Sequence, residues 1–315
     1  MLNTFTISLS QTIRIFLFIA VGYLLSKARI LPQSSGNVLS KLSILLLNPM
    51  LTIYTFSEQC TPENFRENTA QILYGTAMFG LAVVTAHLLT PLFSKEKKSQ
   101  GVYRYALGIP NTGTFRAPIV LALFGSEGYF IGSLYNIAAT IITYTWGILQ
   151  FKSSPKNGKI AFFLKKMLNV NTIALFVGAF LGLTGTARYI PDIVMEDIEL
   201  LGNAFVPLAM LSLGMFVADY RMNELVPSGR TLVFTGWRMI LLPILMVLLL
   251  KAVKAPDFAI ILTALSFSCP CGMYAVLFPA ANGDSTQIGV NIMVFSSIAS
   301  VIIIPFIYAF TCSLL

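Results

Sequence analysis

The stretch Gly108–Phe124, which reads GIPNTGTFRAPIVLALF, decides how this chain is interpreted. It lies in an apolar run long enough to cross a bilayer, yet it contains Pro110, Asn111, Arg116 and Pro118. Proline removes a backbone donor, and an Arg in hydrocarbon costs about 3 kcal/mol or more. Irregular backbone at membrane depth is tolerated only where protein buries it or where it lines a cavity. The stretch therefore predicts a broken helix at a solute-binding site.

The composition is that of a polytopic, all-α membrane protein. The chain is 56% hydrophobic and 11% charged, whereas soluble domains have about 25% charged residues. The net charge of +8 is explained by basic loops that fix orientation in a lipid bilayer, so no nucleic-acid partner is expected. Ten apolar runs predict transmembrane helices near residues 5–26, 37–57, 68–93, 103–124, 128–151, 169–187, 194–218, 231–251, 257–281 and 286–313.

The loop charges predict the orientation of these ten helices. With the N-terminus outside, thirteen Lys and Arg residues lie in cytoplasmic loops and four lie in outer loops. The positive-inside rule then places both termini outside the cytoplasmic membrane. The four outer residues are Arg66, Arg188, Lys251 and Lys254.

An internal repeat divides the chain near its midpoint. The linker, residues 152–168 with five lysines, separates a first five-helix repeat, residues 1–151, from a second, residues 169–315. Five spans is an odd number, so the two repeats must be inverted relative to each other. Inverted repeats with matching interrupted helices are typical of secondary transporters, although a duplicated scaffold without transport stays open. Pro49 and Pro207 are expected to break the second and seventh spans, and Pro110 and Pro270 the fourth and ninth. Three pairs of markers lie 158 to 160 residues apart: Ala28 and Ala187, Pro49 and Pro207, and Pro110 and Pro270.

The paired breaks at residues 107–113 and 267–272 are the candidate substrate site. If the two helices unwind and cross there, half-helix N-termini and free amides favour an anion. Asn111 and Thr112 add donors, and the guanidinium of Arg116 suits a carboxylate. In the alternative reading the prolines are ordinary kinks, and Arg116 snorkels outward near Glu127. Arg14 and Arg238 have looser claims on the same role.

Acid–base groups are scarce in the predicted spans. No Asp or Glu falls clearly within a span, and the only histidine is His87. A buried carboxylate relay is therefore not expected, and coupling through His87, through the substrate carboxylate or through Na⁺ stays open. Little machinery remains for an enzyme, and no cofactor or metal is expected. Cys269 and Cys271 enclose a proline within the membrane, which argues against a metal or disulfide role.

Other polar and small residues predict cavity lining or packing. Each polar one is alternatively an interhelical hydrogen-bonding residue, and each small one a close-packing position. The polar candidates are Asn48, Tyr135, Asn136, Tyr144, Asn203, Ser268 and Asn291, and the small ones include Gly178, Gly182, Ser212 and Gly214.

Taken together, the motifs resemble the auxin efflux carrier family over essentially the whole chain. That family includes plant auxin carriers and bacterial proteins described as malonate or malate transporters. The resemblance rests on Pro110-Asn111-Thr112, Ala117-Pro118-Ile119, Leu123-Phe124-Gly125, Asn48-Pro49, Pro207–Leu211, Ser212–Gly214, Pro270 and Ile303-Ile304-Pro305.

The resemblance implies a bile-acid symporter-like fold with scaffold and transport domains, each drawn from both repeats. The fourth and ninth helices would cross at Pro110 and Pro270, with Asn111 contacting substrate and Tyr144 lining the site. Cys271 and Met273 complete the predicted substrate-binding set. Family members often dimerise through the scaffold domain, so a homodimer is open. Arg116 and Ala117 depart from the family pattern of a small or apolar residue followed by Gly.

We therefore expect a secondary active transporter of a small organic anion, auxin-like or a dicarboxylate, working by alternating access in a bacterial cytoplasmic membrane. Two alternatives stay open. One is a Na⁺- or H⁺-coupled exchanger or symporter of the same architecture for another solute. The other is a ligand sensor that does not transport.

Overall fold

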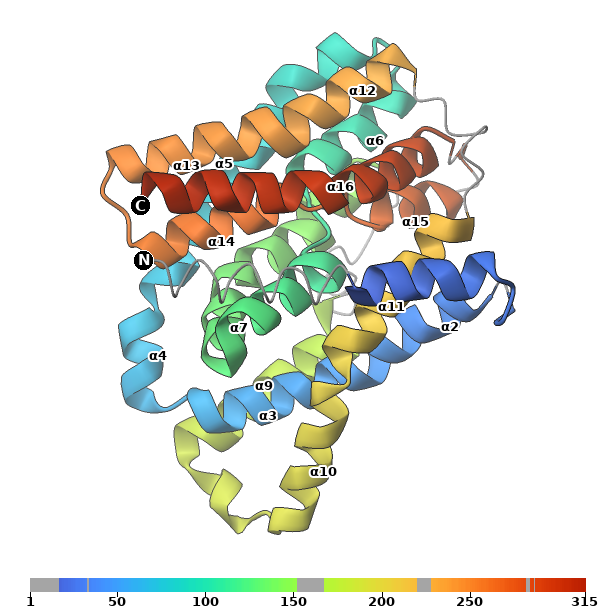
Figure 1. Ribbon diagram of the computed structural model, residues 1–315. Helices are drawn as coiled ribbons and strands as arrows, with labels where there is room; N and C mark the ends of the chain where they lie inside the picture. The colour runs from blue at the N-terminus through green and yellow to red at the C-terminus, as the bar shows by residue number, and fades with distance from the viewer. Residues whose placement is uncertain (1–16, 33, 152–166, 220–227, 282–283, 286) are drawn as a thin grey trace, which may run out of the picture. The chain divides into compact units, whose positions relative to one another are not determined.

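The computed structural model describes residues 17–32, 34–151, 167–219, 228–281, 284–285 and 287–315 (Figure 1). The described part is helical, apart from loops and one isolated antiparallel bridge. Its helices form two compact units that interleave along the chain. Arg14 and nearly all of the linker lie outside the described residues. Each unit draws segments from both predicted repeats, while the inversion of those repeats stays a prediction.

Unit 1 comprises Met1–Ala70, Ala117–Leu134 and Leu168–Arg221. Within it α3 packs along α9 and α10, and α2 packs along α11 (Figure 1). Its elements are Leu17–Lys27, α2 (Ser35–Leu42), the π-helical turn η1 (Ser43–Leu47), α3 (Asn48–Gln59), α4 (Pro62–Asn68), the start of α7 (Ala117–Ile142), α9 (Val170–Thr184), the 3₁₀ turn η4 (Thr186–Tyr189), α10 (Asp192–Asn203) and α11 (Phe205–Asp219).

Small residues let the helices of unit 1 approach closely. A Cβ added at Gly178 of α9 would lie 2.7 Å from the Cβ of Phe56 in α3. One added at Gly202 of α10 would lie 2.8 Å from the Cα of Leu51. Gly182 and Gly214 face the backbone carbonyls of Phe56 and Ile19 in the same way. The expected packing role of the glycines is confirmed.

Unit 2 comprises Gln71–Arg116, Tyr135–Met167 and Met222–Leu315. In it α14 packs against both α13 and α16, and α6 contacts α15 and α16 (Figure 1). Its elements are α5 (Ala70–Phe93), α6 (Lys97–Gly108), the π turn η2 (Thr112–Arg116), the end of α7, the π turn η3 (Thr143–Gly147), α12 (Gly229–Gly236), the π turn η5 (Trp237–Leu241), α13 (Leu242–Ala252), α14 (Asp257–Phe267), α15 (Tyr274–Ala281) and α16 (Gln287–Leu314).

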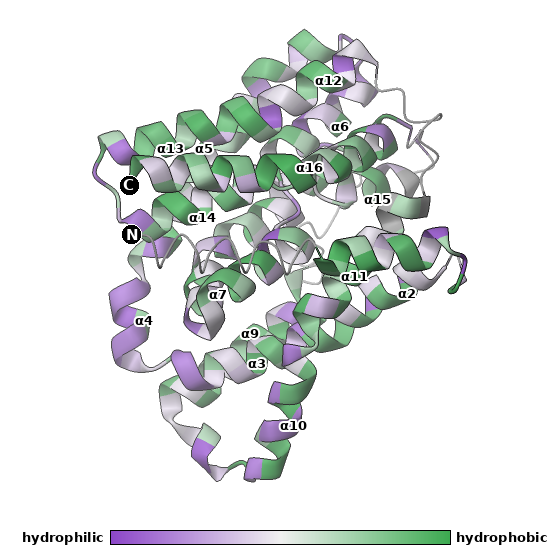
Figure 2. Ribbon diagram, in the orientation of Figure 1, coloured by the Kyte–Doolittle hydropathy of each residue, from purple (hydrophilic) through white to green (hydrophobic). Residues whose placement is uncertain are grey.

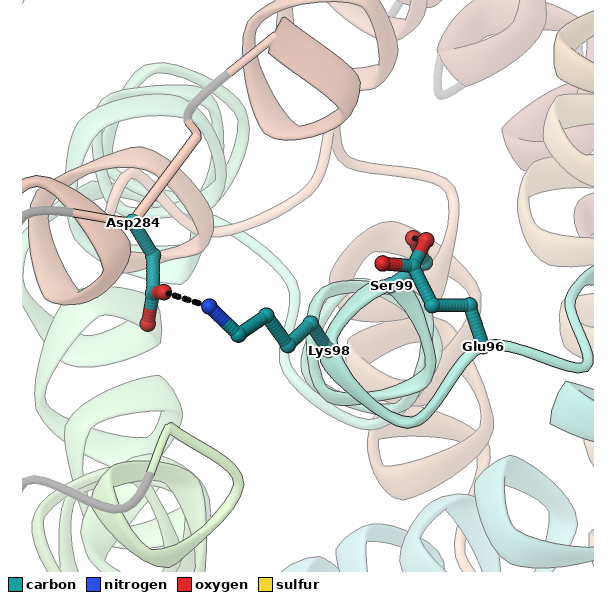
Figure 3. A network of polar contacts seen from close by, with 4 residues as sticks. All are labelled: Glu96, Lys98, Ser99 and Asp284. Atoms are coloured by element: carbon teal, nitrogen blue, oxygen red, sulfur yellow. Dashed lines mark hydrogen bonds and ion pairs between the residues drawn. The ribbon is translucent and has the colours of Figure 1, made fainter.

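An exposed ion pair joins the start of α6 to the segment before α16. Lys98 Nζ lies 2.9 Å from a carboxylate oxygen of Asp284, and Figure 3 shows the lysine reaching across to it. One residue further, Ser99 Oγ donates to Glu96 at 2.7 Å. The hydrogen bond with Asp284 raises the pKa of Lys98.

Several helices are long and apolar enough to cross a membrane. In the described residues there are six: Ser35–Gln59, Pro62–Phe93, Thr112–Gly147, Asp192–Met215, Gly229–Ala252 and Gln287–Leu314. Figure 2 shows apolar residues dominating α5, α13 and α16, whereas α4 is largely hydrophilic. This is a multi-pass membrane protein, and the count of ten spans stays a prediction.

Prolines and π turns occur together in these helices. Pro49, Pro118 and Pro243 each lie two residues after a π turn, namely η1, η2 and η5. A proline leaves the carbonyl four residues earlier without its donor, and a wider turn rearranges that hydrogen bonding. The prediction that Pro49 breaks the second span is wrong, because the helix continues through the π turn. Near Pro207 a single turn residue, Ala204, separates α10 from α11 within the membrane-length helix Asp192–Met215.

The end of the predicted fourth span is marked by Gly125. This residue has φ 66° and ψ −163° inside α7, a backbone conformation that side chains with a Cβ disfavour. The chain therefore changes direction at Gly125, and α7 consists of two helical pieces. The predicted spans ended at residue 124 and resumed at 128, in agreement with this kink.

Candidate functional site: a crossing of two broken helices

The structure brings the two predicted breaks together inside unit 2. Helix α6 ends at Gly108 and α14 ends at Phe267, and an antiparallel bridge pairs Pro110 with Cys271. The backbone N–H of Asn111 donates to the carbonyl oxygen of Pro270 at 2.8 Å. In return, Gly272 N–H donates to the carbonyl oxygen of Ile109 at 3.0 Å.

Local sequence explains why the chain is extended at the crossing. A residue before proline is pushed out of the helical region, and Ile109 accordingly has φ −126° and ψ 106°. Pro110 has no N–H to continue α6. On the other side, Cys271 N–H donates to Ser296 Oγ of α16 at 3.3 Å. The segment at Cys271 is thus hydrogen-bonded both to the segment at Pro110 and to helix α16.

The bridge changes the expectation that free amides hold an anion. The amides of Asn111 and Gly272 are engaged across the crossing, so neither can serve a ligand. Beyond the bridge the half-helices start at Thr112 and Tyr274, and the positive end of each helix dipole lies there. Several first-turn amides are already engaged locally, since Thr112 N–H donates to the Pro110 carbonyl oxygen at 3.0 Å and Ala275 N–H donates to that of Gly272 at 3.0 Å. Gly113, in this first turn, is exposed and would have open space around an added Cβ.

The two ends of the Asn111 side-chain amide have different roles. Its Oδ1 accepts from Thr114 N–H at 3.3 Å, which caps the half-helix. The NH₂ group is then the part that can donate to a bound anion. The side chain is half-buried, whereas that of Thr112 is 7% exposed. Asn111 is therefore better placed than Thr112 to meet a solute.

Arg116 lies in the π turn that follows the crossing and is only 3% exposed. Its charge acts electrostatically on Cys269 of the second break and on Tyr135 of α7. A snorkelling arginine keeps its head group at the interface. The burial of Arg116 instead fits an interior charge beside the crossing.

Arg238 contacts the crossing directly. It lies in the π turn between α12 and α13, is 1% exposed, and donates to three backbone carbonyls. Nη2 donates to Pro270 at 2.9 Å, Nη1 donates to Cys269, and Nε donates to Ala106 near the end of α6. One guanidinium thus connects both broken helices.

The remaining predicted residues of unit 2 are distributed around the crossing. Tyr144 OH and Tyr274 OH are 2.9 Å apart, and Tyr274 follows the half-buried Met273. Cys271 is fully buried in the core cluster that contains Tyr105. Ser268 is also fully buried and donates to the carbonyl oxygen of Leu265 at 3.4 Å. Ser268 and the Cys271 side chain are thus core residues, while Tyr144 and Met273 are more accessible.

His87 and Asn136 belong to unit 2 but, among the described residues, do not contribute hydrogen bonds to the crossing. Trp146 Nε1 donates to His87 Nε2 at 3.0 Å, so the imidazole accepts through that nitrogen. Asn136 Oδ1 is buried and has no hydrogen-bond partner among the described residues. Neither residue has a hydrogen bond to the bridge in the described part of the chain.

Asn48 organises a polar network within unit 1. Its Nδ2 donates to Asn171 Oδ1 at 2.8 Å, and Tyr129 OH donates to its Oδ1 at 2.8 Å. Thr52 Oγ1 lies 2.9 Å from Tyr129 OH. Asn48 is therefore an interhelical hydrogen-bonding residue, which was the alternative to its lining a cavity. Asn203, Pro49 and Pro207 also lie in unit 1, with Asn203 exposed at the end of α10.

Comparison with known proteins decides the family. A family model described as "Membrane transport protein" matches residues 7–308. The chain belongs to this family. It is the auxin efflux carrier family, so the resemblance seen in the sequence is confirmed.

Two archaeal relatives are similar to this family member. An uncharacterized transporter of Methanothermobacter thermautotrophicus is 22% identical over 309 residues, which cover 95% of this chain and 96% of the relative. An uncharacterized transporter of Methanocaldococcus jannaschii is 24% identical over 208 residues, which cover 64% of this chain and 66% of the relative. Neither name states a substrate.

Two features of this membrane transport protein's site were missed or underweighted in the sequence. Arg238 was only a loose candidate, because a buried arginine reveals no partner until the fold brings one near. The π turns were not foreseen, yet η2, η3 and η5 carry Arg116, Tyr144 and Arg238. Such turns occur often at functional sites. A proline two residues downstream was the available signal for η2 and η5.

Proposed function

We propose that this membrane transport protein is a secondary active carrier of a small organic anion, such as a dicarboxylate or an aromatic carboxylate. The observation that carries the proposal is the Pro110–Cys271 bridge, beyond which two half-helices start. The N-terminal ends of these half-helices favour negative charge. The Asn111 NH₂ group and the buried Arg116 add hydrogen-bond donors that also favour an anion.

In the proposed cycle the anion binds beyond the bridge, and the protein then alternates between inward-open and outward-open states. Broken helices at the centre of inverted repeats work in this way in other secondary carriers. The carrier would operate in the cytoplasmic membrane with both termini outside, and labelling of single cysteines introduced at Arg66 and at Lys97 would test that orientation. A homodimer, which the family resemblance implies, is part of the proposal.

Uptake into proteoliposomes tests the site. Radiolabelled malonate and a labelled aromatic carboxylate would be compared for wild type, Asn111→Ala and Arg116→Ala, with the exposed Arg66→Ala as matched control. Loss of a hydrogen bond to a charged group predicts a fall of about tenfold or more in the first two variants. Unchanged flux in both would refute the proposed site.

The same assay separates the other candidate functions. A symporter or exchanger for an inorganic ion would move that ion without any organic anion. Carriers of related architecture that move inorganic ions favour this candidate. Against it, no Asp or Glu among the described residues bonds to the crossing. A ligand sensor would shift the melting temperature with malonate or benzoate while showing no flux under any gradient.

A further inference from the structure

The C-terminal ends of two helices place a cluster of backbone carbonyl oxygens at the crossing. Helices α6 and α14 both terminate there, and the last carbonyls of a helix lack intrahelical donors. Each helix also has a negative dipole at this end. The Ile109 and Pro270 carbonyls each accept a bond from the opposite break. The carbonyls of Ala106 and Cys269 are not part of that pair and need another positive partner.

Arg238 supplies that partner from a third element. Its three guanidinium nitrogens each donate to a different carbonyl, those of Ala106, Cys269 and Pro270. Within the described residues no ion pair involves Arg238, so the crossing itself provides its counter-charge. Arginine is permanently protonated and has a planar fork that can meet several acceptors at once. The side chain is 1% exposed, so bulk cations do not compete for these carbonyls.

In other carriers built from inverted repeats, unwound carbonyls and half-helix C-termini hold the coupling cation. We propose that the guanidinium of Arg238 takes the place of a coupling cation at this crossing, so that transport does not require Na⁺ there. This inference rests on the proposed function for its transport part only, because the carbonyl cluster and its occupant do not depend on the substrate. Arg238 is then a positioning residue that keeps the crossing intact through the transport cycle.

Cation dependence of stability tests the inference without any transport. The melting temperature of the purified full chain would be measured in NaCl, KCl and choline chloride. Wild type is expected to respond equally to all three salts. Arg238→Ala opens the carbonyl cluster, so its melting temperature should fall and then recover with millimolar guanidinium chloride. The exposed Arg66→Ala should show no such recovery. If guanidinium fails to stabilise a folded Arg238→Ala more than Arg66→Ala, the inference is wrong.

Flux measurements supply the second arm. Uptake of radiolabelled malonate by wild-type proteoliposomes should be the same in NaCl and in choline chloride. Arg238→Lys keeps the charge but loses the fork, and should lose about tenfold or more of the flux. Saturable stimulation of wild-type flux by Na⁺ would overturn the inference even if Arg238→Ala does not fold. Absence of flux for every carboxylate, with the stability pattern intact, would instead refute only the proposed function.

Discussion

The backbone N–H of Asn111 donates to the carbonyl oxygen of Pro270 across 2.8 Å, although the two residues are far apart in the sequence. This bond satisfies backbone groups that the interrupted helical hydrogen bonding leaves without a partner. Each proline removes one backbone donor from its own segment. The backbone groups left without a helical partner are satisfied by the opposite segment, since Asn111 N–H donates to the Pro270 carbonyl and Gly272 N–H donates to the Ile109 carbonyl. The cost of breaking two membrane helices is thereby reduced at a single place, which is where a solute can meet polar groups.

The close fit at Gly272 predicts a specific destabilisation. An added Cβ would lie 3.0 Å from Tyr105 OH and 3.2 Å from the Ile109 carbonyl oxygen. Gly272→Ala should therefore lower the free energy of unfolding by about 1–3 kcal/mol, because the bridge must shift. Thermal unfolding in detergent measures this. Gly113→Ala is the control, since an added Cβ there meets nothing within 4 Å. Equal melting temperatures for the two variants would contradict the prediction.

The two roles of the Asn111 side chain can be separated by substitution. Asn111→Asp keeps an oxygen for Thr114 N–H but replaces the NH₂ donor with a negative charge. We expect unchanged thermal stability together with loss of carboxylate uptake. Asn169→Asp is a matched control, because Asn169 caps α9 in the same way through Asn171 and Thr172. Both variants should remain stable, and only the first should lose flux; wild-type uptake by Asn111→Asp would show that the NH₂ group does not bind substrate.

The network around Asn48 predicts a loss of stability rather than of substrate binding. Asn48→Ala leaves the partner atoms of Asn171 and Tyr129 without their bonds, which should cost about 1–3 kcal/mol. The double variant Asn48→Ala with Asn171→Ala should cost less than the sum of the single changes, because the residues share one bond. Denaturation of the three variants would show this. Strict additivity would mean that the network is not coupled.

The Lys98–Asp284 pair predicts a dependence on alkaline pH. The hydrogen bond with Asp284 raises the pKa of Lys98, so protonated lysine favours the folded state. That contribution is fully present below the ordinary lysine pKa of 10.5 and is lost as the pH rises through the raised value. In low salt the melting temperatures of wild type and Lys98→Met should therefore converge above pH 10.5. Because the pair is exposed, the difference at neutral pH should be small and should shrink with salt; a difference that grows with pH would contradict this assignment.

Sequence reasoning located the breaks at Pro110 and Pro270 and the family, because proline and glycine act locally on the backbone. It failed at Pro49, where the effect of a proline depends on whether the preceding turn can widen. It also expected free amides at the two breaks, whereas those of Asn111 and Gly272 pair across the crossing, which becomes visible only when distant segments come together. The role of Arg238 required knowledge of three carbonyls from two other elements, and nothing in its own neighbourhood specifies them.

The π turn that carries Arg238 has a further consequence for comparing relatives. A π turn holds one more residue than an α-helical turn, and one residue corresponds to about 100° of rotation around a helix axis. Deleting a single residue from Trp237–Leu241 would therefore turn the side chains before or after it onto a different face. A relative without this insertion would show a one-residue gap here and would present another side chain to the crossing.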